Sequence, residues 1–192
     1  MRNELNMRKL AVIPARGGSK RVPGKNVRLF NGKPIIQYSI EVAHQSGLFD
    51  EVIVSTEDKK IAKIAKKLGA SVPFYRSEDA AGDKSTLAEV IIDVMDSYKS
   101  IGKEFDYFCC IFATAPFITP KKLSEAFNKM INGNYDSVLP LIPYPVPIHQ
   151  AFKLDSKSDK VEMFFDDQYG IMTQDMATSY YDAGQFYWMK PN

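Results

Sequence analysis

The stretch Lys9-Leu-Ala-Val-Ile-Pro-Ala-Arg-Gly-Gly-Ser-Lys-Arg-Val-Pro-Gly-Lys-Asn26 joins a short apolar run to a basic, glycine-rich loop. The apolar run, Lys9 to Pro14, is typical of a first buried strand. Glycines allow successive backbone N–H groups to converge on an anion, and Arg and Lys side chains bind phosphate oxygens. The loop is therefore predicted to bind a polyphosphate at the carboxyl end of this strand. Its four cations alternate with small residues: Arg16, Lys20, Arg21 and Lys25.

Two common phosphate-binding patterns do not match this loop. A Walker A loop requires G-x-x-x-x-G-K-[ST]; aligned on Gly24-Lys25, Ser19 replaces the first Gly and Asn26 replaces the Ser or Thr. A dinucleotide fingerprint, G-x-G-x-x-G, fails because Gly17-Gly18 is not followed by glycines at the required intervals. A solvated basic loop, such as a nuclear-type signal, is the alternative to phosphate binding.

Strands and helices alternate along the chain as far as residue 142. Apolar and β-branched runs predict four further strands, at 51–56, 71–75, 105–112 and 136–142. Apolar side chains at helical spacing predict helices over about 34–43, 61–68, 87–98 and 120–131. The alternation predicts an α/β fold with a doubly wound, mostly parallel sheet. Ligands of such sheets bind at the carboxyl ends of the strands, which is where the basic loop lies.

The pattern changes after Pro143. Prolines at alternate positions cannot lie in a central strand and predict an extended connector: Pro143, Pro145 and Pro147. Residues 153–174 mix charged and aromatic side chains and are predicted to form a projecting hairpin arm, and residues 185–188 form a further short strand. We therefore divide the chain into a nucleotide-binding core (8–143), an arm (144–180) and a returning core strand (181–192).

Composition excludes several classes of protein. Of 192 residues, 45% are hydrophobic and 25% charged, so the chain is long and apolar enough to bury a core. Its 25 basic and 23 acidic residues give a net charge of only +2, which argues against a nucleic-acid partner. The apolar runs are too short for a membrane-spanning helix or a signal-peptide core.

The two cysteines are adjacent, Cys109 and Cys110. This spacing suits neither a mutual disulfide nor a Cys-x-x-Cys site, so both are predicted to pack on a buried strand. Free cysteines indicate a reducing compartment, and we expect the cytoplasm.

Residues 15–26 resemble the A-R-x-x-S-K-x-x-P-x-K-N loop of the CMP-sugar synthetases, the cytidylyltransferases that activate 3-deoxy nonulosonic acids. Asn31-Gly32-Lys33-Pro34 and Val54-Ser55-Thr56-Glu57-Asp58 are similar to later landmarks of that family. Cys110-Ile-Phe-Ala-Thr-Ala-Pro-Phe117 and Tyr181-Asp-Ala-Gly-Gln-Phe-Tyr-Trp188 resemble its pseudaminic acid branch. The sialic acid branch usually has a Gln that serves the sugar where Phe112 stands.

The resemblance implies a Rossmann-like nucleotidyltransferase sheet of the nucleotide-diphospho-sugar transferase type, with a dimerisation arm and a homodimeric enzyme. The implied reaction converts CTP and pseudaminic acid to CMP-pseudaminic acid and pyrophosphate, for glycosylation of a surface glycan or flagellin. The alternatives are the same reaction on legionaminic, sialic or 3-deoxy-octulosonic acid, or a truncated, non-catalytic CTP-binding or dimerisation module.

The resemblance also assigns residues. Arg16 and Lys25 are the expected catalytic residues, in contact with the triphosphate. Thr114, Gln185 and Tyr187 are expected to bind the sugar, although Thr114 could instead cap a helix and Tyr187 could be a core aromatic. The alternative for Arg76 is a surface ion pair. The expected CTP-binding residues are Arg16, Gly17, Gly18, Ser19, Lys20, Lys25, Asn26 and Arg76.

Magnesium is the implied cofactor. The family binds Mg²⁺ through an Asp-x-Asp pair that follows the strand ending near Trp188, and we expect these ligands in a C-terminal segment absent from this chain. Asp166, Asp167 and Asp182 do not occupy the matching position, so no metal ligand is assigned within the sequence. His44 is expected to be a surface residue without a catalytic role, and the role of His149 is left open.

Overall fold

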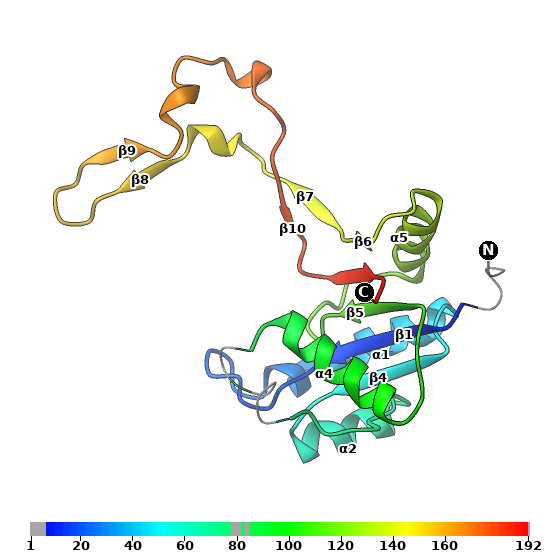
Figure 1. Ribbon diagram of the computed structural model, residues 1–192. Coiled ribbons are helices and arrows are strands. Elements are labelled where there is room, and N and C mark those ends of the chain that lie inside the picture. Colours follow the sequence, from blue (N-terminus) through cyan, green and yellow to red (C-terminus); the bar gives the residue numbers. More distant parts are fainter. Residues whose placement is uncertain (1–6, 78–81, 83–84, 192) are drawn as a thin grey trace. The chain divides into compact units, whose positions relative to one another are not determined.

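The computed structural model describes residues 7–77, 82 and 85–191 (Figure 1). Its main sheet has five strands in the order β4 (Glu51–Ser55), β1 (Lys9–Pro14), β5 (Tyr107–Ile111), β11 (Phe186–Met189) and β6 (Ser137–Val138). Strand β1 pairs in parallel with β4 and β5, whereas β11 is antiparallel to both β5 and β6. The sheet is therefore mixed. The prediction of a mostly parallel sheet is correct except for β11, which lies in reverse orientation between two strands that share a direction.

Helices cover both faces of this sheet. Helices α1 (Ile35–Ser46), α2 (Lys59–Lys67) and α5 (Pro120–Asn132) pack on the face that carries Ala11, Ile13 and Ile111. Helix α4 (Leu87–Ser100) packs on the opposite face, against Leu10 and Val12, and crosses the front of the sheet in Figure 1. The alternation of strand side chains between the two faces explains why β1 and β5 are almost continuously apolar.

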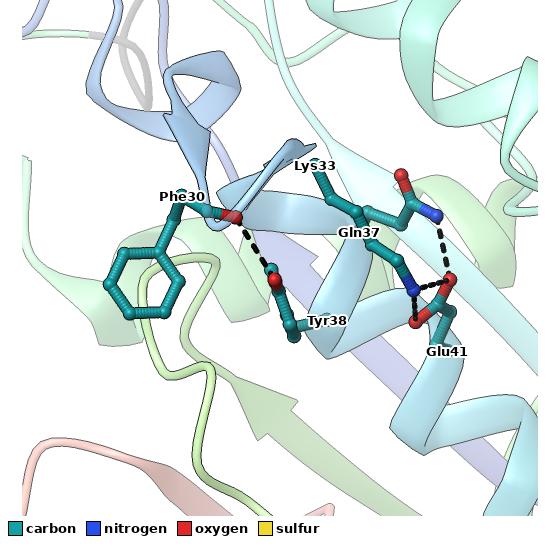
Figure 2. Close-up of polar contacts among 5 residues, drawn as sticks. All are labelled: Phe30, Lys33, Gln37, Tyr38 and Glu41. Carbon is teal, nitrogen blue, oxygen red and sulfur yellow. Dashed lines mark hydrogen bonds and ion pairs between the residues drawn. The ribbon is translucent and has the colours of Figure 1, made fainter.

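The hairpin after the basic loop is fixed to α1. Strands β2 (Leu29–Phe30) and β3 (Lys33–Pro34) form this hairpin, and Figure 2 shows its contacts with the helix. The Tyr38 hydroxyl donates to the carbonyl of Phe30 at 2.9 Å, and Lys33 Nζ lies 3.1 Å from both carboxylate oxygens of Glu41. These contacts anchor the end of the basic loop to a helix of the core.

Residues Leu141–Ala183 form a second compact unit. Within it, β7 (Leu141–Pro143) pairs with β10 (Tyr180–Asp182), and β8 (Phe152–Leu154) pairs with β9 (Val161–Met163). Three short 3₁₀ turns connect these strands: η3 (Ile148–Gln150), η4 (Asp166–Gln168) and η5 (Thr173–Asp175). The β8–β9 ribbon confirms that the 153–174 region contains a hairpin.

Two predicted strands are wrong in extent. Residues 71–75 contribute only one parallel bridge, between Ser71 and Ile53, because Pro73 has no N–H with which to continue the ladder. The predicted strand at 136–142 is split around Pro140: β6 joins the main sheet, and β7 pairs with β10. Proline interrupts a regular ladder at both positions.

The remaining predicted helices and strands are present. Helix α4 begins with a capping box in which Thr86 accepts from the N–H of Glu89 and the Glu89 carboxylate accepts from that of Thr86. Cys109 and Cys110 are free and buried on β5, as predicted. Among the residues described, no helix has the length and apolar character needed to span a membrane.

Candidate functional site

A cleft of about 280 Å³ lies where β1 and β5 end. Its wall is formed by the loop after β1, the segment after β5, the beginning of α4 and Arg76, which follows the 71–75 segment. Six of the residues predicted from the sequence meet here: Arg16, Ser19, Lys25, Asn26, Arg76 and Thr114. Gly17, Gly18, Lys20, Gln185 and Tyr187 are not among the lining residues. The structure thus brings together most of the predicted nucleotide-binding side chains and one of the three expected to bind the sugar.

Asn26 braces the glycine-rich loop from within. Its side chain is buried, and its Nδ2 donates to the carbonyl of Arg16 at 2.9 Å. Gly24, with φ of 63°, adopts the left-handed conformation that turns the chain into the 3₁₀ turn η2 (Lys25–Val27). Arg16 and Lys25 are therefore held at opposite ends of one folded loop, both beside the cleft.

Gly17 is closely packed against the turn that follows β4. Its N–H donates to Glu57 Oε1 at 2.7 Å, so this backbone donor is engaged within the protein. A Cβ at position 17 would lie 2.4 Å from Asp58 Oδ2, which explains why glycine is needed there. Gly18, in contrast, is exposed, and a Cβ added to it would meet nothing within 4 Å.

Arg76 is a buried cation, with only 8% of its surface exposed. Its Nε donates to Ser55 Oγ at 3.1 Å, and its Nη2 donates to the carbonyl of Ser55 at 2.6 Å. Burial lowers the pKa of the guanidinium from its ordinary value, and the charge of Glu57 partly opposes this shift. Because the side chain is buried and lines the cleft, the surface ion pair considered from the sequence is wrong.

The beginning of α4 contributes lining residues that the sequence analysis missed. Ser85, Thr86 and Leu87 lie there, together with Val90 one turn later. The positive end of the helix dipole thus borders the cleft, where it favours an anion. The Thr86-Leu-Ala-Glu89 capping-box pattern was a signal for this helix start, although nothing in it pointed to the cleft.

Phe112 forms an aromatic part of the cleft wall just after β5. Its N–H donates to the carbonyl of Gln185 at 2.9 Å, and its ring lies edge-to-face with that of Tyr187 at 5.3 Å between centroids. Gln185 and Tyr187 therefore contact Phe112, which lines the cleft, but they do not line it themselves. Their predicted contact with the sugar stays a prediction, and so does that of Thr114.

Charge in the cleft is one-sided. Among the described residues that line it, Arg16, Lys25 and Arg76 are cationic and none is a carboxylate. In a partly enclosed site these cations attract a polyphosphate more strongly than they would in open water.

The described residues include no preformed cluster of metal ligands. Within 7–77, 82 and 85–191, no group of three or more His, Cys, Asp or Glu side chains could hold a metal. Asp166, Asp167 and Asp182 are exposed in the 141–183 unit. We therefore derive no step through a metal from these residues.

The two histidines lie outside the cleft lining. His44 is exposed on α1, and its Nε2 lies 3.2 Å from the carbonyl of Gly69, which ties α1 to the end of α2. His149 belongs to the 141–183 unit, where its ring packs against that of Phe165 with 5.5 Å between the ring centroids. The predicted surface position of His44 is thus correct.

Comparison with known proteins identifies the family. The family model described as cytidylyltransferase matches residues 10–188, nearly the whole chain. The chain belongs to the cytidylyltransferase family. A pseudaminic acid cytidylyltransferase of Campylobacter jejuni subsp. jejuni serotype O:2 is 39% identical over 181 residues, which cover 94% of this chain and 78% of that protein. The resemblance drawn from the glycine-rich loop is confirmed.

A further relative shares this sequence pattern, and a solved structure shares the fold. A CMP-N,N'-diacetyllegionaminic acid synthase of Legionella pneumophila is 40% identical over 163 residues, covering 83% of this chain and 69% of that protein. The structure of a CMP:2-keto-3-deoxy-manno-octonic acid synthetase complexed with CTP superposes with a TM-score of 0.68 at 22% identity, covering 95% of this chain and 74% of the other. This last likeness shows a shared α/β fold with a mixed sheet.

Proposed function

We propose that this cytidylyltransferase joins CTP to pseudaminic acid, giving CMP-pseudaminic acid and pyrophosphate. The observation that carries the proposal is the convergence of Arg16, Lys25 and Arg76 in one cleft, in a chain that is 39% identical to a pseudaminic acid cytidylyltransferase. The product would serve the glycosylation of a surface glycan or flagellin. We place the reaction in the cytoplasm, in keeping with the two free, buried cysteines.

The chemistry is an in-line displacement at the α-phosphorus of CTP. The anomeric hydroxyl of the sugar acid gives up its proton to water and forms the new P–O bond, the bond between the α-phosphorus and the bridging oxygen breaks, and pyrophosphate leaves. Charge grows on the phosphate oxygens as this happens. Arg16 and Lys25 would neutralise it from the glycine-rich loop, while Arg76 would hold the nucleotide from the β4 side. Ser19 and Asn26 line the same end of the cleft, and Gly17, Gly18 and Lys20 complete the proposed CTP-binding loop.

Phe112 supports a less polar sugar acid. Its ring cannot donate or accept the hydrogen bonds of an amide side chain, so the wall that it shares with Ala113 favours contact with a methyl-bearing group of the sugar. Thr114, Gln185 and Tyr187 are the residues proposed to bind the remaining polar groups. The legionaminic acid relative supports the second candidate, the same transfer onto legionaminic acid.

A pyrophosphate-release assay with CTP, Mg²⁺ and pseudaminic acid tests the proposal. We expect turnover by the wild-type chain and a loss of kcat/KM of about 100-fold or more in Arg16→Ala and in Lys25→Ala, since each removes one preorganised charge from the transition state. Lys122→Ala, an exposed lysine of α5 outside the cleft lining, is the matched control and should retain kcat/KM within about twofold. Absence of pyrophosphate with every nonulosonic acid, or full activity in both loop variants, would contradict the proposal.

Magnesium belongs to this proposal as a reagent of the assay. The resemblance to CMP-sugar synthetases implies that Mg²⁺ accompanies CTP, although the described residues present no ligand cluster for it. Pyrophosphate release that continues unchanged after the metal is chelated would remove Mg²⁺ from the proposal.

We also propose that two copies associate through the 144–180 arm. In this region large apolar side chains are exposed, including Phe152, Val161, Phe164 and Tyr169, and such a surface is usually covered by a partner. Sedimentation equilibrium at micromolar concentration should give twice the chain mass. A monomer under these conditions would contradict the association.

A further inference from the structure

Glu57 is an unexplained acidic residue beside a cationic cleft. It follows β4 directly and lies between Thr56, whose side chain is buried, and Asp58, which caps α2 by accepting from the N–H groups of Lys60 and Ile61. It does not line the cleft. A carboxylate so close to a polyphosphate site opposes anion binding by its charge, so its presence requires another reason.

The first clue is the peptide unit between Arg16 and Gly17. Its N–H donates to Glu57 Oε1 at 2.7 Å, and its carbonyl accepts from Asn26 Nδ2 at 2.9 Å. Both polar ends of one peptide plane are therefore held by side chains. A hydrogen bond to an ionised carboxylate is stronger than one between neutral groups, so the Glu57 contact is the firmer of the two. The Arg16 side chain is attached directly beside this peptide, whose N–H and carbonyl are both hydrogen-bonded.

The second clue is that the turn holding Glu57 is itself rigid. The Asp58 N–H donates to Thr56 Oγ1 at 3.1 Å, and the Arg76 N–H donates to the carbonyl of Thr56 at 3.0 Å. Gly17 packs so tightly on Asp58 that a Cβ has no room. The Glu57 carboxylate thus extends from a fixed turn to a fixed point on the loop.

The third clue is the other carboxylate oxygen, Oε2. It is buried and has no hydrogen-bond partner among the residues that the structure describes. The negative charge of Glu57 acts on the buried Arg76 guanidinium, where it opposes the lowering of the pKa by burial. The Glu57 carboxylate is therefore hydrogen-bonded to the backbone beside Arg16, and its charge also acts on Arg76.

We propose that Glu57 is a positioning residue that aligns Arg16 for phosphoryl transfer by fixing the Arg16–Gly17 peptide. This inference rests on the proposed cytidylyl transfer. Because Arg16, Lys25 and Arg76 all remain when Glu57 is changed, binding of CTP in the ground state survives. The alignment of Arg16 with the charge that develops in the transition state is lost. The effect of losing Glu57 falls on kcat and leaves the KM for CTP nearly unchanged.

Three substitutions separate hydrogen bonding from charge. Glu57→Gln retains an oxygen that can accept from Gly17 but loses the charge, whereas Glu57→Asp retains the charge on a side chain one methylene too short. Glu57→Ala loses both. We expect kcat to fall about 10- to 100-fold in Glu57→Ala and Glu57→Asp, with the KM for CTP within about threefold of wild type, and Glu57→Gln to retain kcat within about threefold. Asp58→Asn keeps the size and capping oxygen of the neighbouring residue and is the matched control, with kcat within about twofold.

Amide hydrogen exchange at Gly17 provides a readout that does not depend on activity. Its exchange should accelerate about tenfold or more in Glu57→Ala and Glu57→Asp and stay near the wild-type rate in Glu57→Gln. If Glu57→Ala does not fold, the Gln and Asp variants decide the question. If the wild-type chain releases no pyrophosphate with any nonulosonic acid, the proposed function fails, while the exchange rates still test the clamp.

The inference is overturned by any of three results in folded variants. One is retention of kcat within threefold in Glu57→Asp. Another is loss of activity in Glu57→Gln as large as in Glu57→Ala, because an oxygen that accepts from the Gly17 N–H would then not be enough to align Arg16. The third is equal exchange of the Gly17 amide in all variants.

Discussion

Replacement of Gly17 by alanine tests how tightly the glycine-rich loop is packed. The added Cβ would lie 2.4 Å from Asp58 Oδ2 and 2.9 Å from Asp58 Cβ, closer than real Cβ contacts allow. Asp58 cannot simply rotate away, because its Oδ1 accepts from the N–H groups of Lys60 and Ile61 at 2.7 and 3.0 Å. Either the helix cap or the loop must move.

The cost follows from the contacts that would be lost. Loss of an N-terminal helix cap costs about 1 kcal/mol, and loss of a hydrogen bond to a charged group, such as that from Gly17 N–H to Glu57, about 1.5–3 kcal/mol. Relaxation of the exposed loop avoids part of this, so we expect the free energy of unfolding to fall by about 2 kcal/mol. For a chain of this size, that corresponds to a decrease in Tm of roughly 4–8 °C.

Thermal unfolding followed by circular dichroism measures this change, and the chain provides its own control. At Gly18, one residue further, a Cβ would meet nothing within 4 Å, so Gly18→Ala should melt within about 1 °C of wild type. Equal melting temperatures for the two alanine variants would refute the packing argument. A crystal structure of Gly17→Ala in which neither the loop nor the Asp58 side chain is displaced would refute it as well.

Three further predictions concern other parts of the core and site. Arg76→Lys cannot reproduce the two hydrogen bonds to Ser55, so calorimetry should show CTP binding weakened about tenfold; unchanged affinity would contradict the role of Arg76. Trp188 is fully buried, and its Nε1 donates to the carbonyl of Leu123 at 3.1 Å. Trp188→Phe should therefore lower the free energy of unfolding, measured by urea titration, by about 1–3 kcal/mol. An unfolding midpoint equal to that of the wild type would contradict this. Burial raises the pKa of Cys110 to about 12, so at pH 8 its thiol is protonated and should resist a disulfide reagent until urea is added; stoichiometric labelling of the native protein would contradict this.

The sequence predicted most of the core because its signals are local. The apolar runs of β1 and β5 and the helical spacing of Ile61, Ala65 and their neighbours are visible without knowledge of the fold. The errors came where pairing depends on distant residues. Residues 136–142 are apolar enough for one strand, yet β6 pairs with β11 and β7 with β10, and both partners lie far later in the chain.

The same distinction applies to the site. Arg16, Lys25 and Asn26 belong to one continuous motif, and their place beside the cleft was predicted from it. Glu57 and Thr86 were not assigned, because their importance depends on contacts that the fold creates, such as the bond from Gly17 N–H to Glu57. From its charge alone, Glu57 would have been predicted to be an exposed residue just before helix α2.

The most direct test of the central claim is ³¹P NMR of the wild-type chain with CTP, Mg²⁺ and pseudaminic acid. Cytidylyl transfer predicts that the triphosphate signals disappear while the phosphodiester resonance of the CMP-sugar and the resonance of pyrophosphate grow in equal amounts. Conversion of CTP to CDP and inorganic phosphate, or a spectrum that does not change, would contradict it.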